Sequence, residues 1–323
     1  MKKWPLMMAC LGAALLLWRL PVQAQTPAGG NACAPMGWFP ADFGLKDHTV
    51  FTYNNRYYLA SIDTSDNTHF AYGVSDDLCA WTTLDPILAQ RPALPWSESI
   101  IWAPDVYTEN GTYYMFYTSV EQTFTQRIAL ATSTNPADPA SWTVDSSFVL
   151  TPTHTGAVWS ANTWADMRDP HVFRMDGLYY LLYTGRDTDG GIIGLATASA
   201  ITGPWQDFGS ILTLPSGMPE SPTMLQANGG FYLIYNRAGD GAASREKYRF
   251  GPAPGGPWGA EMPLLPGGWA HEVWAGLDGR TYASYLTSYT VSIAPLIWNT
   301  RYNPPQPFVG AALHELFIPL VRR

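Results

Sequence analysis

Five residues that could carry out chemistry recur along the sequence at intervals of about 50 to 60 residues, the length of one repeated unit. They are Asp47, Asp105, Asp169, Glu220 and His271. Hydrolysis of a glycosidic bond uses two carboxyl groups: one protonates the leaving oxygen, and the other acts on water or directly on the anomeric carbon. A lone acid at the start of a strand is usually a solvated turn cap. Acids at four of five equivalent positions instead predict a shared acid–base site.

Each of these residues opens a segment with the same organisation. A turn containing Gly or Asn follows, and then an aromatic strand of the type Tyr-Tyr-x-x-Tyr; the five segments span residues 47–61, 105–117, 169–183, 220–235 and 271–285. Asn-Gly and Asp-Gly between apolar runs favour two-residue hairpin turns, because both central residues of a type I′ turn have positive φ. Each segment is therefore predicted to be a β-hairpin.

Two further strands complete each repeat. Residues 128–132 and 193–197 are typical third strands, and Gly203-Pro204-Trp205 marks a turn to the last one. Five repeats of four strands predict an all-β fold, a five-bladed β-propeller, with residues 37–323 as a single catalytic domain. The lead residue of each blade would open its innermost strand, so that all five converge on one end of the central channel. Residues 313–321 are expected to form a strand that closes the ring.

The first 24 residues have the features of a secretory signal peptide: Lys2 and Lys3, an apolar run over residues 6–17, and the site Val22-Gln23-Ala24. We expect cleavage near Ala24, a linker over residues 25–36, and a secreted protein, extracellular or periplasmic. The alternative, a lipoprotein acylated at Cys10, leaves almost no apolar stretch before that cysteine. In an oxidising compartment Cys33 and Cys79 are the candidates for one disulfide, and the sequence leaves their pairing open.

The composition restricts the partners. The formal net charge is −8, with 18 Lys and Arg against 26 Asp and Glu, and this provides no basic cluster for a nucleic acid. Aromatic residues make up 14% of the chain, and sugars are neutral ligands whose apolar faces lie well on such rings. We expect a monomer that binds a neutral polysaccharide or oligosaccharide, and neither nucleic acid nor a membrane.

Two short motifs resemble those of glycoside hydrolase family 43: Trp102-Ala103-Pro104-Asp105 and Glu220-Ser221-Pro222. A third, Arg168-Asp169-Pro170, is similar to the Arg-Asp-Pro element of the related fructan-cleaving families 32 and 68. The resemblance covers nearly the whole mature chain and extends to the related families 32, 62 and 68. It implies a five-bladed, inverting enzyme that acts on polysaccharides or oligosaccharides containing arabinose or xylose. By this resemblance, Asp47 is the base that activates water, Glu220 is the acid, and Asp169 orients and tunes Glu220.

Four further residues are predicted to bind substrate: Trp102, Asp105, Arg168 and His271. Arg168 has two interpretations, a contact with a sugar hydroxyl or an ion pair with Asp169. His271 has three: a calcium ligand, a partner for a catalytic carboxylate, or a channel-lining residue without chemistry. The resemblance associates this histidine with calcium in the central channel. The reaction itself requires no cofactor, and a single His gives little metal specificity.

Two other functions stay open. A retaining, fructan-active enzyme would hold its two carboxyl groups about 5 to 5.5 Å apart, whereas inversion leaves about 6.5 to 9.5 Å for a water molecule. A non-catalytic carbohydrate-binding propeller would use aromatic rings without needing the acids. Five tryptophans near the strand entrances are candidate sugar platforms, with core packing as the other interpretation: Trp38, Trp102, Trp159, Trp164 and Trp269.

Overall fold

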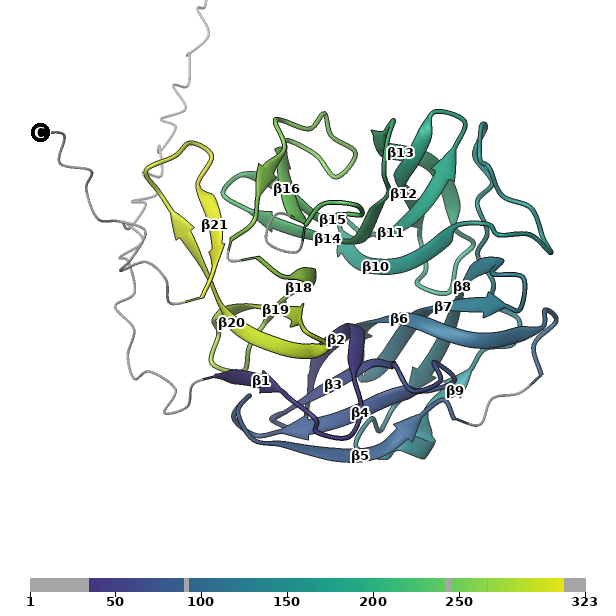
Figure 1. Ribbon diagram of the computed structural model, residues 1–323, viewed down its shortest axis with the longest axis vertical. Helices are drawn as coiled ribbons and strands as arrows, with labels where there is room; N and C mark the ends of the chain where they lie inside the picture. The colour runs from purple at the N-terminus through teal and green to yellow at the C-terminus, as the bar shows by residue number, and fades with distance from the viewer. Residues whose placement is uncertain (1–34, 90–92, 242–244, 266, 311–323) are drawn as a thin grey trace, which may run out of the picture. The chain divides into compact units, whose positions relative to one another are not determined.

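The computed structural model describes residues 35–89, 93–241, 245–265 and 267–310. The residues from Cys33 onward form one compact unit, and its described part consists of five β-sheets arranged as a ring of blades (Figure 1). The predicted five-bladed propeller is confirmed. The predicted signal peptide lies outside the described residues. No described segment is a helix of the length and apolar character that crossing a bilayer requires.

Each blade is an antiparallel sheet whose strands follow one another in sequence. Blade 1 consists of β2 (Leu45–Tyr53), β3 (Arg56–Asp63), β4 (Phe70–Ser75) and β5 (Trp81–Ile87). Blade 2 consists of β6 (Glu98–Glu109), β7 (Thr112–Glu121), β8 (Gln126–Ser133) and β9 (Thr143–Val144), with the short 3₁₀ helix η1 (Pro139–Ser141) before β9.

The other three blades repeat this order. Blade 3 consists of β10 (Met167–Met175), β11 (Leu178–Asp187), β12 (Gly190–Ala198) and β13 (Gln206–Leu214). Blade 4 consists of β14 (Pro219–Ala227), β15 (Gly230–Arg237), β16 (Glu246–Gly251) and β17 (Met262–Pro263). Blade 5 contains β18 (Trp269–Ala275), β19 (Thr281–Thr287) and β20 (Thr290–Asn299), and the short strand β21 (Gln306–Val309) also pairs with β20.

The ring is closed by a strand from the other end of the chain. β1 (Met36–Trp38) pairs antiparallel with β20, with Met36 opposite Ile293 and Trp38 opposite Val291, and so supplies the fourth strand of blade 5. Met36, expected as the last linker residue, therefore belongs to the propeller. The strand predicted for residues 313–321 lies outside the described residues. Cys79 is disulfide-bonded, and Cys33, the other candidate for a disulfide, lies outside the described residues.

The predicted two-residue hairpin turns between the first two strands are confirmed in blades 1 to 4, whereas five residues connect β18 to β19 in blade 5 and only Gly279 among them has positive φ. Asn54 and Asn55, between β2 and β3, have φ of 47° and 58°. Asn110 and Gly111, between β6 and β7, have φ of 52° and 78°. Positive φ at both central residues gives the turn a twist that matches the flanking strands. The turns therefore fix the register of each hairpin.

The paired tyrosines explain how the blades adhere to one another. Successive side chains of a strand point to opposite faces of its sheet. In β3, Tyr57 packs into the core shared with blade 5, and Tyr58 packs into the core shared with blade 2. In β7, Tyr113 and Tyr114 divide in the same way between blades 1 and 3. The hydrophobic core is thus five separate layers, one between each pair of adjacent blades.

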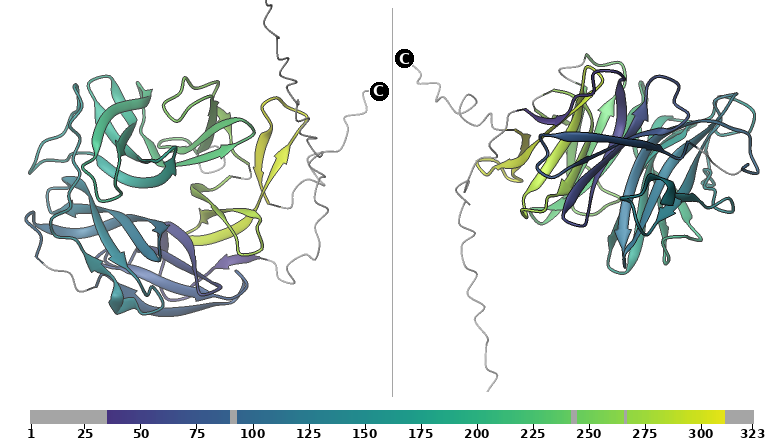
Figure 2. Two further views of the ribbon diagram at one scale, coloured as in Figure 1. Left: turned by 180° about the vertical axis from the view of Figure 1, so that it is seen from behind. Right: turned by 90° about the horizontal axis from the view of Figure 1, so that it is seen from below.

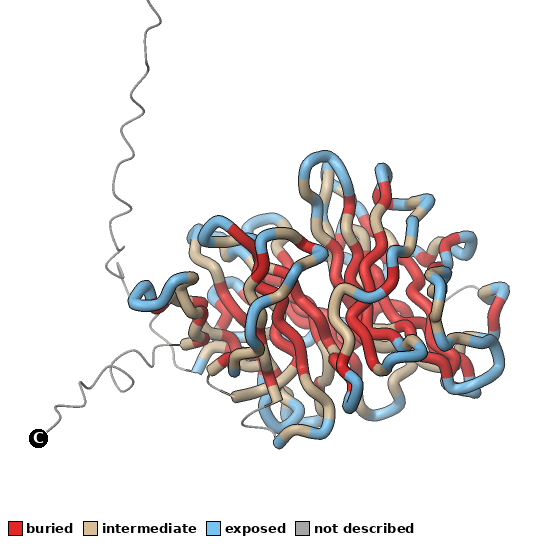
Figure 3. Tube along the Cα trace, turned by 90° about the horizontal axis from the view of Figure 1, so that it is seen from above, coloured by how far each residue is buried: buried red, intermediate tan, exposed pale blue. Residues whose placement is uncertain are grey.

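The first strand of each blade lies at the centre of the ring. β2, β6, β10, β14 and β18 contact one another in sequence, and β18 returns to β2. Figure 2 shows this arrangement from behind and from below, and Figure 3 shows buried central strands with exposed connecting loops. Five strands that start in the same direction bring residues far apart in the sequence into one central channel.

Candidate active site

The innermost strand of every blade carries a β-bulge at the same level. The pairing shifts between Lys46 and His48, Trp102 and Asp105, Arg168 and His171, Glu220 and Thr223, and Trp269 and Glu272. In blades 2 to 5 the second residue of this segment has positive φ: 43° at Ala103, 54° at Asp169, 48° at Ser221 and 49° at Ala270. A bulge leaves a residue unpaired and re-aims side chains, and here it aims them into the channel.

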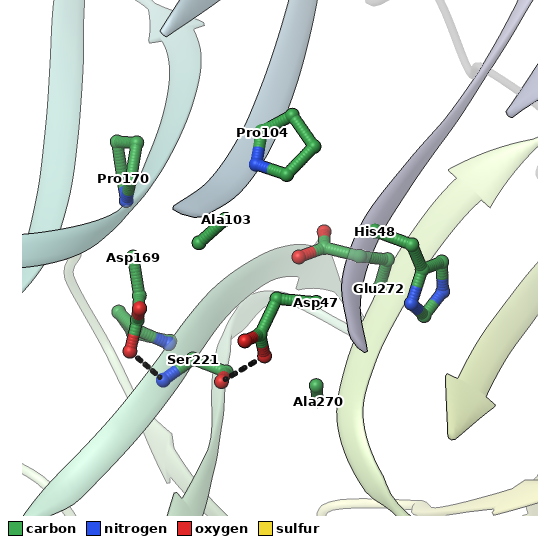
Figure 4. A pocket seen from close by; sticks show the side chains of 10 residues that line it. Asp47, His48, Ala103, Pro104, Asp169, Pro170, Ser221, Ala270 and Glu272 are labelled. Atoms are coloured by element: carbon green, nitrogen blue, oxygen red, sulfur yellow. Dashed lines mark hydrogen bonds between the residues drawn. The ribbon is translucent and has the colours of Figure 1, made fainter. Parts of the chain in front are cut away.

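A small pocket lies within this ring of bulges (Figure 4). All five innermost strands contribute to its wall, and two of the predicted catalytic acids are part of it. The lining residues are Asp47, His48, Ala103, Pro104, Asp169, Pro170, Ser221, Pro222, Ala270 and Glu272.

Ser221 joins the two acids in the pocket wall (Figure 4). Its hydroxyl donates to Asp47 Oδ1 at 3.2 Å, and its backbone N–H donates to Asp169 Oδ2 at 2.9 Å. The same Asp169 oxygen accepts a hydrogen bond from Thr184 Oγ1 at 3.1 Å. Asp47, from β2, and Asp169, from β10, are therefore held on either side of one residue of β14.

Arg168 connects the third predicted acid to the same group. Its Nη2 donates to Glu220 Oε1 at 2.7 Å, its Nη1 donates to Asp166 Oδ1 at 2.5 Å, and its Nε lies 3.7 Å from Asp169 Oδ2. Arg168 is largely buried, whereas the side chain of Glu220 is 33% exposed. The ion pair predicted between Arg168 and Asp169 is present. Arg168, rather than Asp169, is the direct partner of Glu220.

The crowding of negative charge is visible in the pKa values. Burial, together with the neighbouring carboxylates of Asp169 and Glu220, raises the pKa of Asp47 from 3.8 to about 7. Burial also raises the pKa of Asp169, and Glu220 adds to this, although Arg168 opposes it. Desolvation and like charge both favour a protonated carboxyl. Such perturbed groups in a cleft are typical of catalytic sites.

The prediction that all five lead residues share one end of the channel is wrong for Asp105 and His271. The bulge places Ala103 and Ala270 at the level of Asp169, so Asp105 lies further along its strand. Asp105 is buried and its Oδ2 accepts a hydrogen bond from the N–H of Val172. It lines a second pocket further along the channel, not the pocket that contains Asp47 and Asp169.

His271 does not line either of these two pockets. Its side chain is fully buried, its ring stacks on Tyr285 with centroids 5.0 Å apart, and its Nδ1 lies 3.3 Å from Glu246 Oε1. A side chain in this position cannot contact a sugar in the pocket. The interpretation of His271 as a substrate-binding or channel-lining residue is therefore wrong.

Three other residues lie close enough together that they could hold a cation. Asp105, His171 and Glu272 each offer one ligand atom, and these atoms lie within 4.8 Å of one another. The Nε2 of His171 is buried and has no hydrogen-bond partner among the described residues. Calcium takes six to eight oxygen ligands, so this set fits a cation only if water completes the shell. His271, for which calcium binding was one interpretation, is not part of this set.

The tryptophans that were candidate sugar platforms differ in their exposure: some are buried in the core, and others lie at the surface. Trp38 is buried, and the indole N–H of Trp159 donates to the carbonyl of Gln126 at 2.9 Å. Trp164 is 65% exposed. Trp102 is half-buried and stands at the bulge of blade 2, next to Ala103 of the pocket wall.

Sequence reasoning missed Ser221, Asp166 and Glu272 as parts of the site. Ser221 and Glu272 are neighbours of residues that were singled out, and the Glu-Ser-Pro and His-Glu sequences gave no sign of which side chain faces the channel. Asp166 lies two residues before Arg168, a spacing that would have indicated a neighbour on the same side of a strand.

Residues 42–157 match the family model described as glycosyl hydrolases family 43. A β-D-galactofuranosidase, xynD, from Aspergillus niger is 26% identical over 253 residues, which are 74% of this chain and 68% of that protein. A thermostable family-43 glycoside hydrolase of known structure has a TM-score of 0.63 at 20% identity, over 85% of this chain and 95% of its own. The native arabinanase of Bacillus subtilis gives 0.63 at 21% identity, over 84% and 99%.

The solved structures share the propeller fold with this chain. The sequence match falls on blades 1 and 2 and on the start of the connection to blade 3, and so includes Asp47 and the Trp102-Ala103-Pro104-Asp105 motif. The predicted resemblance to family 43 is confirmed: residues 42–157 match the family model, the chain has the five-bladed β-propeller fold of the solved structures, and these matches support a glycoside hydrolase.

Proposed function

We propose that the chain hydrolyses O-glycosidic bonds in arabinose- or xylose-containing polysaccharides or oligosaccharides, with inversion at the anomeric carbon. The observation that carries this proposal is the gathering of Asp47, Asp169 and Glu220 around Ser221 and Arg168. Three acids from three blades would not be held together in a propeller that only binds sugars, because each raises the energy of the others.

Asp47 is the proposed base. It acts when ionised, and a pKa of about 7 matches it to proton abstraction from water near neutral pH, where a general base is most effective. The hydroxyl of Ser221 holds Asp47 Oδ1, which leaves Oδ2 to accept the proton of the attacking water.

Glu220 is the proposed acid. Arg168 donates to its Oε1, so the proton that Glu220 delivers to the leaving oxygen is carried on Oε2. The partial exposure of Glu220 lets this oxygen reach the glycosidic bond of a bound substrate. Asp169 contacts no reacting atom in this scheme; it positions the site through Ser221 and Arg168.

The test is a release assay on arabinan, arabinoxylan, xylan and levan, with an aryl β-D-galactofuranoside added because of the fungal relative. Proton NMR of the first product reports its anomeric configuration. Release of arabinose or xylose units with inverted configuration supports the proposal. Retained configuration on levan would favour the fructan-active alternative, and binding without release from any substrate would favour a carbohydrate-binding propeller.

The proposed reaction uses side chains alone and requires no cofactor. A cation held by Asp105, His171 and Glu272 would place positive charge in the channel near the catalytic acids. It would offset part of the negative charge of Glu272, which also lines their pocket. EDTA treatment is expected to leave kcat unchanged and to lower the melting temperature if a bound cation stabilises the channel. Loss of kcat that Ca²⁺ restores would contradict a cofactor-independent reaction.

We further propose that the protein is exported, with its signal peptide cleaved near Ala24, and acts as a monomer. Expression of the full chain in a bacterial host, followed by N-terminal sequencing of the exported product and light scattering, tests both points. A product that keeps residues 1–24, or a mass of two or more chains, would contradict them.

A further inference from the structure

An aromatic surface lies on the rim beside the proposed acid. It consists of Trp102, Phe124 and Trp164, which we call the rim platform. The rings of Phe124 and Trp164 stack with centroids 5.0 Å apart and an interplanar angle of 26°, and Trp102 lies 6.3 Å from Phe124. Trp164 is 65% and Phe124 39% exposed. Large rings exposed side by side are unusual on a soluble surface unless they bind something.

The two segments that carry the rim platform are fastened to each other. Phe124 lies in the turn between β7 and β8, and Trp164 lies in the connection from blade 2 to blade 3. The hydroxyl of Thr125 donates to the carbonyl of Thr163 at 2.7 Å and accepts from its N–H at 3.2 Å. Gln126 N–H donates to the carbonyl of Ala165 at 3.0 Å. The stacked pair is therefore preorganised, which lowers the entropy lost on binding.

A chain of polar contacts links the rim platform to Glu220. The indole N–H of Trp164 donates to Asp166 Oδ1 at 3.3 Å, and Arg168 donates to the same oxygen and to Glu220. At the other end, Trp102 is followed by Ala103 of the pocket wall. The rings thus begin at the pocket edge and continue outward on the side where Glu220 stands.

We propose that the rim platform binds a sugar ring on the leaving-group side of the bond that is cleaved. The proposal rests on the proposed function, because the acid must stand next to the leaving oxygen, and the sugar attached to that oxygen then lies on the side of Glu220. Trp164 is the ring most available to it. The enzyme would therefore discriminate substrates by the sugar unit on the leaving-group side of the scissile bond.

The chemistry of the surroundings fits a neutral sugar. Uncharged exposed residues flank the rings on both segments: Gln122, Thr123, Asn162 and Thr163. Amide and hydroxyl groups can exchange hydrogen bonds with sugar hydroxyls, while the ring faces cover the apolar C–H face of the sugar. An acidic or basic ligand would find no matching charge among these flanking residues.

The test compares Trp164→Ala with the unchanged enzyme on two kinds of substrate. One is a series of oligosaccharides of increasing length from the polysaccharide that is cleaved best, and the other is the glycosyl fluoride of the same sugar, whose leaving group is too small to reach the rim platform. Loss of one ring face is expected to raise KM for the longer oligosaccharides about tenfold more than for the fluoride. Trp164→Phe should restore most of this difference.

Phe208→Ala is the matched control, because Phe208 is 57% exposed but lies on β13, at the outer edge of blade 3. An equal loss on both substrates in Trp164→Ala, or no loss on the oligosaccharides, would overturn the proposal.

Binding measurements separate this proposal from the proposed function. Affinity electrophoresis in gels containing the polysaccharide, with Glu220→Gln as the background, does not depend on turnover. If the enzyme cleaves none of the substrates but Trp164→Ala still weakens retention about tenfold, the rim platform binds sugar and the proposed function is wrong. If retention is equal with and without Trp164, the rim platform is not a sugar site, whatever the activity.

Discussion

Replacing Asp47 with asparagine removes a charge that destabilises the folded chain. Burial and the carboxylates of Asp169 and Glu220 raise the pKa of Asp47 from 3.8 to about 7. Between these values the folded protein binds a proton that the unfolded chain has already released. The free energy of unfolding therefore falls as the pH rises from about 4 to about 7, and Asp47 contributes no further change above that.

The magnitude follows from the same numbers. At about 1.4 kcal/mol per pH unit, the interval from pH 5 to pH 7 corresponds to at most about 3 kcal/mol. Asp47 is half-buried, and solvent screens part of this interaction, so we expect about 1 to 2 kcal/mol. Asparagine keeps an oxygen that can accept the hydrogen bond from Ser221. The Asp47→Asn variant should therefore gain about this much stability relative to the unchanged protein between pH 5 and pH 8.

The assay is urea unfolding of both proteins at pH 5 and pH 8, in low salt. Asp85→Asn is the control, because Asp85 is an exposed residue of β5 far from the channel strands in the blade order. Its effect should be the same at both pH values. If Asp47→Asn also shifts stability equally at pH 5 and pH 8, the three carboxylates do not share one site, and the reasoning is refuted.

Three other results are expected. Ser221→Ala removes one hydrogen bond to Asp47, worth about 1 kcal/mol, and should lower kcat about fivefold; unchanged kcat would show that Ser221 does not position the base. Arg168→Met leaves the carboxylates of Asp166 and Glu220 without their shared partner and should destabilise the fold by about 3 to 5 kcal/mol, so a melting temperature equal to that of the unchanged enzyme would count against the network. Because Asp47 acts when ionised and the glycosyl fluoride needs no acid, kcat/KM on the fluoride should rise with pH to a plateau with a midpoint near 7, and a midpoint near 4 would mean that the base is a different group.

The fold was predictable because its signals are local and repeated. The paired tyrosines serve two neighbouring blades at once, and the Asn-rich and Asn-Gly turns set hairpin geometry within four residues. Each of these patterns is weak evidence for a blade by itself, but its repetition along the chain made the prediction of a propeller strong. The closing strand β1 was not predicted, since Met36–Trp38 is too short to show an alternating pattern and its partner β20 lies more than 250 residues away.

The acids of the site were singled out from the sequence, but their level in the channel was not. Asp105 and Asp169 both precede the aromatic strand of their blade. The bulges nevertheless make Ala103, which lies two residues before Asp105, the structural equivalent of Asp169. A bulge inserts a residue without a sequence signature, and blade 1 has one residue fewer at this point. In blade 5 the equivalent bulge has the result that Glu272, and not the predicted His271, lines the pocket.

Ser221, Asp166 and Trp164 depend on contacts between blades. Ser221 bonds to residues of blades 1 and 3, and Trp164 meets Phe124 across 40 residues of sequence. No local pattern encodes such meetings, because they arise only after the ring has closed. The structure was needed to distinguish a surface ring such as Trp164 from core rings such as Trp38.

The division of roles between Glu220 and Asp47 is the central claim, and leaving-group dependence tests it most directly. An acid is needed only when the leaving oxygen must be protonated, whereas the base is needed for every substrate. We predict that Glu220→Gln loses about 10² to 10⁴ in kcat/KM on the polysaccharide but remains close to the unchanged enzyme on the glycosyl fluoride, while Asp47→Asn loses activity on both. Equal losses of both variants on both substrates, or full activity of Glu220→Gln on the polysaccharide, would contradict the account.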